Sequence, residues 1–127
     1  MAFLIKAAKV AKKFARAKYS KFEVGAALQT KDGQVFVGCN VESSSYGLTV
    51  CAERVALFKA LSEGADDFLR LAIVTNSKTP TSPCGACRQL LFDYAPGIEI
   101  ILAGNDGEPI IINSEELYPR PFGDHDL

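Results

Sequence analysis

Two short stretches of this 127-residue sequence restrict its fold more than any other feature. Cys51-Ala52-Glu53 stands at the start of an apolar-rich segment typical of a buried helix, and Pro83-Cys84-Gly85-Ala86-Cys87 stands at the start of a second one. Three of the four cysteines therefore lie at predicted helix starts. If these three share one task, the fold must bring the two helix starts side by side.

Apolar runs separated by turn signals predict the elements around these helices. Strand–helix–strand units with apolar strands indicate a partly parallel sheet covered by helices on both faces. We predict an α/β fold, a three-layer α-β-α sandwich around a mixed five-stranded sheet, formed by one domain over residues 1–127. The predicted helices are 3–15, 51–61 and 84–94, and the predicted strands are 23–31, 34–41, 68–75, 98–103 and 109–112. Asp32-Gly33 favours a type I′ hairpin turn between the first two strands. Asn113 or Ser114 is predicted to cap a last helical turn.

Composition limits the partners of the chain. The net charge of −1 gives no overall electrostatic attraction to nucleic acid, and no apolar run approaches the roughly 18 residues that a membrane span needs. We therefore expect a small, weakly charged molecule as partner, and neither nucleic acid nor a membrane. The sequence also has no secretory cleavage pattern, which predicts a reducing, cytoplasmic compartment and free or metal-bound cysteines.

Seven basic residues precede Glu23, the first acidic residue. A transit peptide or a membrane-surface helix has such a composition. We favour a helix with a solvated basic face, because residues 1–19 contain no serine and apolar residues recur at helical spacing. The apolar positions are Phe3, Leu4, Ala7, Ala8, Val10, Ala11, Phe14 and Ala15.

The cysteines at helix starts are suited to bind a metal ion. A helix N-terminus favours the thiolate form, and three thiolates leave one tetrahedral position open, which is typical of catalytic zinc. We predict a zinc ion held by Cys51, Cys84 and Cys87. The alternatives are a thiol redox pair or a structural site closed by Cys39, which lies within an apolar strand and is expected in the core. We expect His125 to be exposed.

Glu53 follows a predicted ligand by two residues, which suits a proton shuttle beside the open metal position. The helix dipole alone would also favour an acid there. The surrounding helix is apolar, which favours a functional role for Glu53 over this explanation, because a buried acid needs a partner or a task. Three thiolates around a doubly charged ion leave negative charge, and we expect Arg54 to offset it by donating hydrogen bonds to sulfur. Arg88 is a second candidate, or else an exposed arginine.

The motif CxE…PCxxC resembles that of zinc-dependent cytidine deaminases. The flanking stretches YSKFEVGAAL (19–28), GCNVESSSYGLTVCAER (38–54) and SPCGACRQ (82–89) are similar to the small homotetrameric class, over essentially the whole chain. The larger dimeric members, and the deaminases acting on nucleic acids, usually have His at the position of Cys51. The resemblance implies one zinc ion per subunit, with Glu53 as the catalytic acid and base, and deamination of cytidine and deoxycytidine in pyrimidine salvage.

The resemblance also implies how a nucleoside is bound. Phe22 would pack against the pyrimidine, the Ala52 backbone would meet the base carbonyl, and Asn40 and Glu42 would bind the ribose hydroxyls.

Two further positions are implied only in outline. Tyr46 and Phe122 match positions that help to close the site, partly from a neighbouring subunit. Where a typical member reads NVENASYG this chain reads NVESSSYG, and its tail LYPRPFGDHDL departs from the usual pattern. These departures concern substrate fit and subunit contact, not the chemistry.

Three rival hypotheses remain at this point. A blasticidin-type nucleoside deaminase shares the same motif. A structural zinc domain that contacts nucleic acid would need a fourth ligand and a basic aromatic surface. A thiol oxidoreductase would need neither Glu53 nor a third cysteine.

Overall fold

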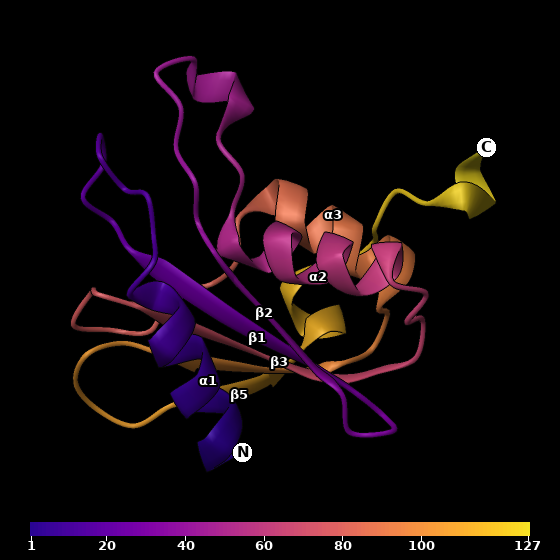
Figure 1. Cartoon of the computed structure of the whole chain (residues 1–127). Helices are drawn as coiled ribbons and strands as arrows, with labels where there is room; N and C mark the ends of the chain where they lie inside the picture. Colours follow the sequence, from indigo (N-terminus) through magenta and orange to yellow (C-terminus); the bar gives the residue numbers. More distant parts are fainter.

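Five strands form one mixed sheet that carries α1 on one face and α2 and α3 on the other (Figure 1). The structure is a computed structural model that describes residues 1–127. The elements are α1 (Ala2–Lys12), β1 (Val24–Thr30), β2 (Val35–Cys39), η1 (Tyr46–Leu48), α2 (Ala52–Ser62), β3 (Phe68–Thr75), α3 (Gly85–Tyr94), β4 (Glu99–Ala103), β5 (Ile110–Asn113), η2 (Ser114–Leu117) and η3 (Asp124–Asp126). The predicted three-layer α/β fold is confirmed.

The strand order is β2-β1-β3-β4-β5, and only β3 and β4 pair in parallel. Because β2 and β3 are both antiparallel to β1, they run in the same direction and end at the same edge of the sheet. The chain passes from β2 toward α2 and from β3 toward α3. The two helices therefore start at one edge, as the cysteine motifs predict.

The hairpin between β1 and β2 differs from the prediction. A type I′ turn needs positive φ at both central residues, but only Gly33 has it, with φ of 96°. The backbone N–H of Thr30 donates to Gln34 O (2.9 Å), and that of Gly33 donates to Thr30 O (3.1 Å). The loop thus has three residues and ends with a glycine in the left-handed conformation, so the prediction of a type I′ turn is wrong.

The start of α2 is seated directly on β2. A Cβ atom added at Gly38 would lie 2.7 Å from both Ala52 O and Ala56 N. Buried Ala52, Ala56, Leu57 and Ala60 continue this contact along the helix. The absence of a side chain at position 38 lets the first turn of α2, with Cys51 at its N-cap, lie against the sheet.

Helix α1 buries one apolar stripe and exposes the other. Leu4, Ala8 and Ala11 pack on the sheet beside the small residues Ala27 and Ala72. The sequence predicts a helix over 3–15 with a second stripe in the same apolar face, but Phe3 and Val10 are 53% and 49% exposed, and Phe14, 70% exposed, follows the end of α1 at Lys12. Small residues on the sheet bring the helix so close that only the stripe facing it directly is covered.

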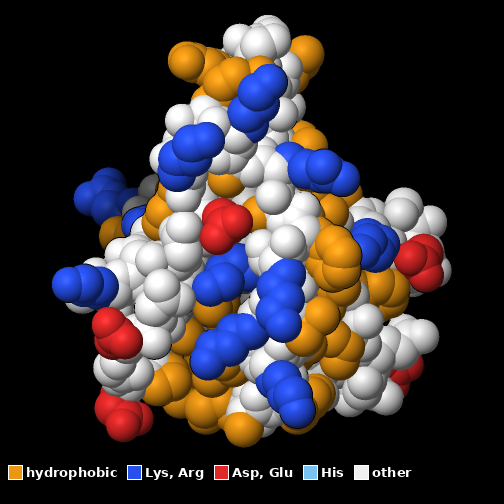
Figure 2. Space-filling model, turned by 60° about the vertical axis from the view of Figure 1, so that its left-hand side comes forward, with side chains coloured by type: hydrophobic (Ala, Val, Ile, Leu, Met, Phe, Trp, Pro, Cys, Tyr) orange, Lys and Arg blue, Asp and Glu red, His pale blue; other side chains and the backbone are white.

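The basic side of α1 is solvated, as predicted. Lys6, Lys9, Lys13 and Arg16 are exposed, and Lys and Arg side chains gather on this side of the molecule (Figure 2). Lys12 is half-buried, and its Nζ donates to Asn105 Oδ1 (3.3 Å). No helix combines the length and the apolar character needed to cross a bilayer.

Candidate active site

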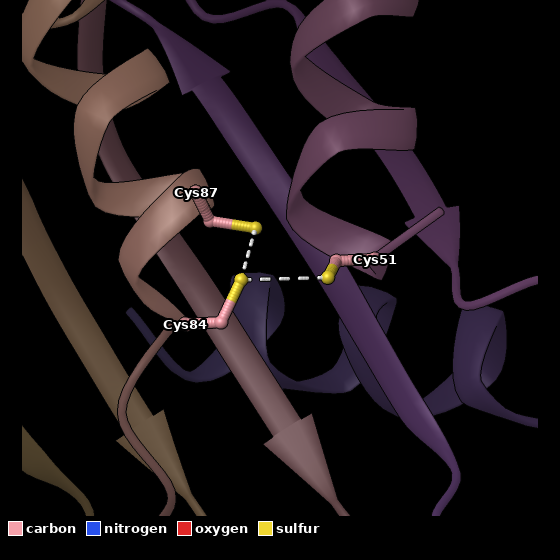
Figure 3. A group of neighbouring side chains, drawn as sticks. All are labelled: Cys51, Cys84 and Cys87. Carbon is pink, nitrogen blue, oxygen red and sulfur yellow. Dashed lines mark hydrogen bonds between the residues drawn. The ribbon is translucent and has the colours of Figure 1, made fainter. Parts of the chain in front are cut away.

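Three cysteine side chains converge where α2 and α3 begin (Figure 3). Cys51 is the N-cap of α2, Cys84 is the N-cap of α3, and Cys87 lies in the first turn of α3. The Sγ atoms of Cys51 and Cys84 are 3.6 Å apart and those of Cys84 and Cys87 are 3.3 Å apart, with all three within 4.8 Å of one another. Cys39, at the end of β2, lies outside this group.

The spacing and chemistry of this group fit a zinc ion. A tetrahedral ion with Zn–S bonds of about 2.3 Å holds its sulfur ligands about 3.8 Å apart, and the observed separations need little change to reach this value. The group contains three donors rather than four. These three residues would hold a zinc ion and leave a fourth ligand position to a water molecule, and the alternative of a site closed by Cys39 is wrong.

Electrostatics in the group favour a thiolate at Cys51. The neighbouring Cys87 thiol and Arg54 lower the pKa of Cys51 to about 5, against the opposing effect of burial. The same interaction raises the pKa of Cys87. Without a metal ion, one sulfur thus ionises first while the other retains its proton. A metal ion recruits the remaining thiolates, because a ligating thiol must be deprotonated.

The two arginines near the cysteines have different contacts. Arg54 Nη2 donates to Cys51 Sγ (3.5 Å) and to Thr49 O (3.1 Å), so it lies where the sequence predicted a donor to sulfur. Arg88 is half-buried and donates to Pro83 O and Leu117 O, both at 2.8 Å. Both expectations for Arg88, a bond to sulfur or free exposure, are wrong, because it ties the start of α3 to η2.

Glu53 lies in the first turn of α2, and only 6% of the residue is exposed. Burial raises the pKa of Glu53, and the nearby charge of Cys51 raises it further. A raised pKa favours the protonated form of the carboxyl group, as is typical of carboxyl groups that act in general acid–base catalysis. The helix dipole alone therefore does not account for Glu53, because Glu53 lines a cavity together with Cys51 and Cys84.

A cavity of about 380 Å³ opens beside the cysteine group, within the size range of small-molecule sites. Its lining includes most of the predicted site residues: Phe22, Asn40, Glu42, Cys51, Ala52, Glu53 and Cys84. Cys87 is 1% exposed and is not part of the cavity wall.

Asn40 and Glu42 both make contacts within the protein. Asn40 Oδ1 accepts from the backbone N–H of Val24 (3.0 Å), and Asn40 Nδ2 donates to Phe22 O (2.8 Å). Asn40 therefore has a structural role in joining two backbone segments, and the sequence does not predict this role. Glu42 accepts hydrogen bonds from the loop around Ser20, which lowers the pKa of Glu42.

Comparison with known proteins assigns this site to a family. The profile of the cytidine and deoxycytidylate deaminase zinc-binding region matches residues 1–103. The chain belongs to the cytidine and deoxycytidylate deaminase family.

Individual relatives agree with this assignment. A cytidine deaminase of Halalkalibacterium halodurans is 48% identical over 125 residues, which cover 98% of this chain and 95% of the relative. The crystal structure of a cytidine deaminase from Burkholderia pseudomallei superimposes with a TM-score of 0.92 at 47% identity, covering 95% of this chain and 98% of the other. A blasticidin-S deaminase of Bacillus cereus is 36% identical over 111 residues, 81% of this chain and 79% of the relative.

Two residues that the family resemblance implied do not line this cavity within one chain of the deaminase. Tyr46 lies in η1 and is 75% exposed, in edge-to-face contact with Tyr19 at 6.1 Å between ring centroids. Phe122 precedes η3 and is 56% exposed. Their predicted part in closing the site stays a prediction that needs a second subunit.

The cavity of this deaminase is also lined by polar residues that sequence reasoning missed, namely Ser20, Thr49, Thr75, Thr81 and Ser82. Thr81 and Ser82 directly precede Pro83 and Cys84, so their place next to a predicted ligand was a usable signal. The loop that carries them is fastened by Asn105, whose N donates to Ser77 O (2.7 Å) and whose Nδ2 donates to Asn76 O (3.0 Å).

Proposed function

We propose that this protein catalyses the hydrolytic deamination of cytidine and deoxycytidine to uridine and deoxyuridine, as a step of pyrimidine salvage. The observation that carries the proposal is one cavity lined by buried Glu53 together with Cys51 and Cys84, whose sulfur atoms form a three-sulfur group with that of buried Cys87. Relatives that are cytidine deaminases and align over nearly the whole chain support the same activity.

Cys51, Cys84 and Cys87 would hold the zinc ion. When bound there, zinc supplies a Lewis acid that lowers the pKa of a water molecule at its open position. Arg54 would partly neutralise the thiolate charge through its bond to Cys51 Sγ.

Glu53 would carry out the proton transfers. Its carboxylate would take a proton from the water that attacks the amino-bearing ring carbon and give it to the adjacent ring nitrogen. It would then take the proton of the hydroxyl now bonded to that carbon and deliver it to the amino group, so that the carbonyl forms as the C–N bond breaks and ammonia leaves. One side chain can serve each step, because the donors and acceptors lie within reach of the same two oxygens, and its raised pKa suits both directions of transfer.

The other cavity residues would orient the nucleoside. Phe22 would pack on the pyrimidine ring, and the backbone of Ala52 at the helix start would meet the base carbonyl. Asn40 and Glu42 would bind the sugar hydroxyls, Asn40 through the hydrogen-bonding capacity that its backbone contacts leave free.

The subunit arrangement and compartment belong to the same proposal. We infer a homotetramer in which Tyr46 and Phe122 close a neighbouring cavity, since both aromatic side chains are exposed in the single chain. Light scattering coupled to size-exclusion chromatography measures the assembly. Four free cysteines suit a reducing, cytoplasmic compartment.

One assay tests the activity. Loss of ultraviolet absorbance is followed with cytidine, deoxycytidine, blasticidin S, cytosine and single-stranded DNA, each with and without a chelator. We expect turnover of the two nucleosides only, abolished by prolonged chelation and restored by zinc. A preference for blasticidin S would favour the rival that the 36% identical relative raises, and turnover that survives complete zinc removal would refute the mechanism.

A further inference from the structure

A hydroxyl group outside the predicted set connects two residues that face the cavity. Ser20 Oγ donates to Glu42 Oε2 and accepts from the backbone N–H of Phe22 (3.0 Å). The backbone N–H groups of Tyr19 and Ser20 both donate to Glu42 Oε1, at 2.9 and 3.1 Å. Ser20 also lines the cavity. Three donors from one loop thus hold a single carboxylate.

Counting donors and acceptors shows what remains for a ligand. An ionised carboxylate offers about four acceptor positions, two on each oxygen. The two N–H groups occupy both positions on Glu42 Oε1, and the hydroxyl occupies one on Oε2. The hydroxyl has a single proton, and because it accepts from Phe22, that proton is directed to Glu42. One acceptor position, on Oε2, stays available to a molecule in the cavity.

The loop that carries Ser20 is held in an uncommon backbone conformation. Lys21 has φ of 61°, in the left-handed region that residues with a side chain seldom occupy. Asn76 fixes it from the end of β3, because its Nδ2 donates to Lys21 O (2.9 Å) and its Oδ1 accepts from Glu23 N (3.2 Å). Such conformations persist where the surrounding structure enforces them, often at functional sites.

We propose that Ser20 is a positioning residue that orients Glu42 Oε2 and thereby selects substrates with a sugar hydroxyl. This inference rests on the proposed function, in which Glu42 binds the sugar. With the serine hydroxyl in place, the open acceptor position points in one direction. Without it, only the two backbone N–H groups at Oε1 hold the carboxylate, so Oε2 is less firmly oriented toward a sugar hydroxyl. Ser20 therefore affects substrate binding and leaves the proton transfers at Glu53 unchanged.

The test uses the full-length, zinc-loaded protein as Ser20→Ala and Ser20→Thr, with Ser62→Ala as matched control. Ser62 Oγ donates to Lys59 O at the far end of α2. For Ser20→Ala we expect kcat/KM for cytidine to fall about tenfold through an increase in KM, which is the scale of one hydrogen bond to a charged group. The kcat/KM for 2′,3′-dideoxycytidine, which lacks the sugar hydroxyls, should change less than about twofold. Ser20→Thr restores the wild-type values, and Ser62→Ala does not differ from wild type.

Calorimetric binding of uridine and 2′,3′-dideoxyuridine to the same variants gives the comparison without turnover. Equal losses with both sugars, or no loss with uridine and cytidine, would overturn the role of Ser20. In a Glu42→Ala background, adding Ser20→Ala should cost nothing more, and a further loss there would overturn it as well. If Ser20→Ala does not fold, Ser20→Cys, whose thiol is only a weak donor, must show the sugar-dependent loss. Wild-type protein that turns over neither nucleoside would instead refute the proposed function.

Discussion

The two ends of the cavity are built in different ways. At the cysteine end (Cys51, Glu53 and Cys84), the side chains come from the starts of two helices that pack on the sheet. At the loop end (Ser20, Phe22 and Glu42), they come from segments outside the helices and strands and are held by hydrogen bonds. Packing thus fixes the residues proposed for the chemistry, while local hydrogen bonds fix those proposed for recognition. Substitutions at the first end should abolish turnover or disturb folding, and those at the second should shift affinity.

The largest effect is expected at Glu53. Glu53→Gln keeps the size of the side chain but cannot exchange protons, so kcat should fall by about 10²–10⁴-fold, the usual share of general acid–base catalysis. Zinc content and binding of uridine, measured by metal analysis and calorimetry, should be retained. Near-normal kcat in this variant would break the distinction between the two ends.

Gly38→Ala tests whether packing places the cysteine end. The added methyl group meets Ala52 O and Ala56 N at 2.7 Å, so we expect a loss of about 1–3 kcal/mol of stability, typical of overpacking, together with weaker zinc retention. Thermal unfolding and metal analysis measure both. Gly47→Ala is the matched control, because a Cβ atom there meets nothing within 4 Å. Similar behaviour of the two variants would contradict the close seating of α2.

Arg54 tests the electrostatics of the same end. Arg54 helps to lower the pKa of Cys51 to about 5, so the thiolate persists as pH falls toward that value. Removing the guanidinium in Arg54→Gln raises this pKa, and zinc should then be released at a higher pH than in wild type. A colorimetric chelator follows release against pH. Arg88→Gln, which loses only bonds to carbonyl oxygens, should keep the wild-type midpoint. If both variants shift it equally, the bond from Arg54 to sulfur is not the cause.

The smallest effect concerns the charge of Glu42. Hydrogen bonds from Ser20 lower the pKa of Glu42, so its carboxylate stays ionised at more acidic pH than an ordinary glutamate. Ser20→Ala should move this pKa upward, toward the ordinary value. Carbon-detected NMR of labelled glutamate follows the titration, and Ser43→Ala is a control, because Ser43 Oγ bonds to Ser45 N and not to Glu42. An unchanged titration in Ser20→Ala would show that the two backbone N–H groups are sufficient.

The sequence predicts the cysteine end well and the loop end only in part, and the reason is the range of the interactions. The positions of Cys51, Cys84 and Glu53 depend on local helix starts and on the common direction of β2 and β3, and both can be read from short motifs and element order. The bond between Ser20 and Glu42 joins residues 22 positions apart in two irregular loops. No periodic pattern marks such a pair.

The same limit explains the errors of prediction elsewhere. Helical spacing identifies Phe3 and Val10 as apolar positions but not which stripe of α1 the sheet covers. The sequence predicts partners of Arg88 only among nearby residues, whereas one of its partners, Leu117 O, lies in η2. Which side chain faces which neighbour is decided by the packing of distant segments.

Asn105 has a consequence that reaches across the sheet. Its side chain accepts from Lys12 of α1, while its backbone and amide hold the segment that leads to Cys84 on the opposite face. The N-terminal helix is thus connected through Asn105 to the segment that leads to Cys84. Truncating that helix would therefore loosen the segment before Cys84 on the opposite face of the sheet.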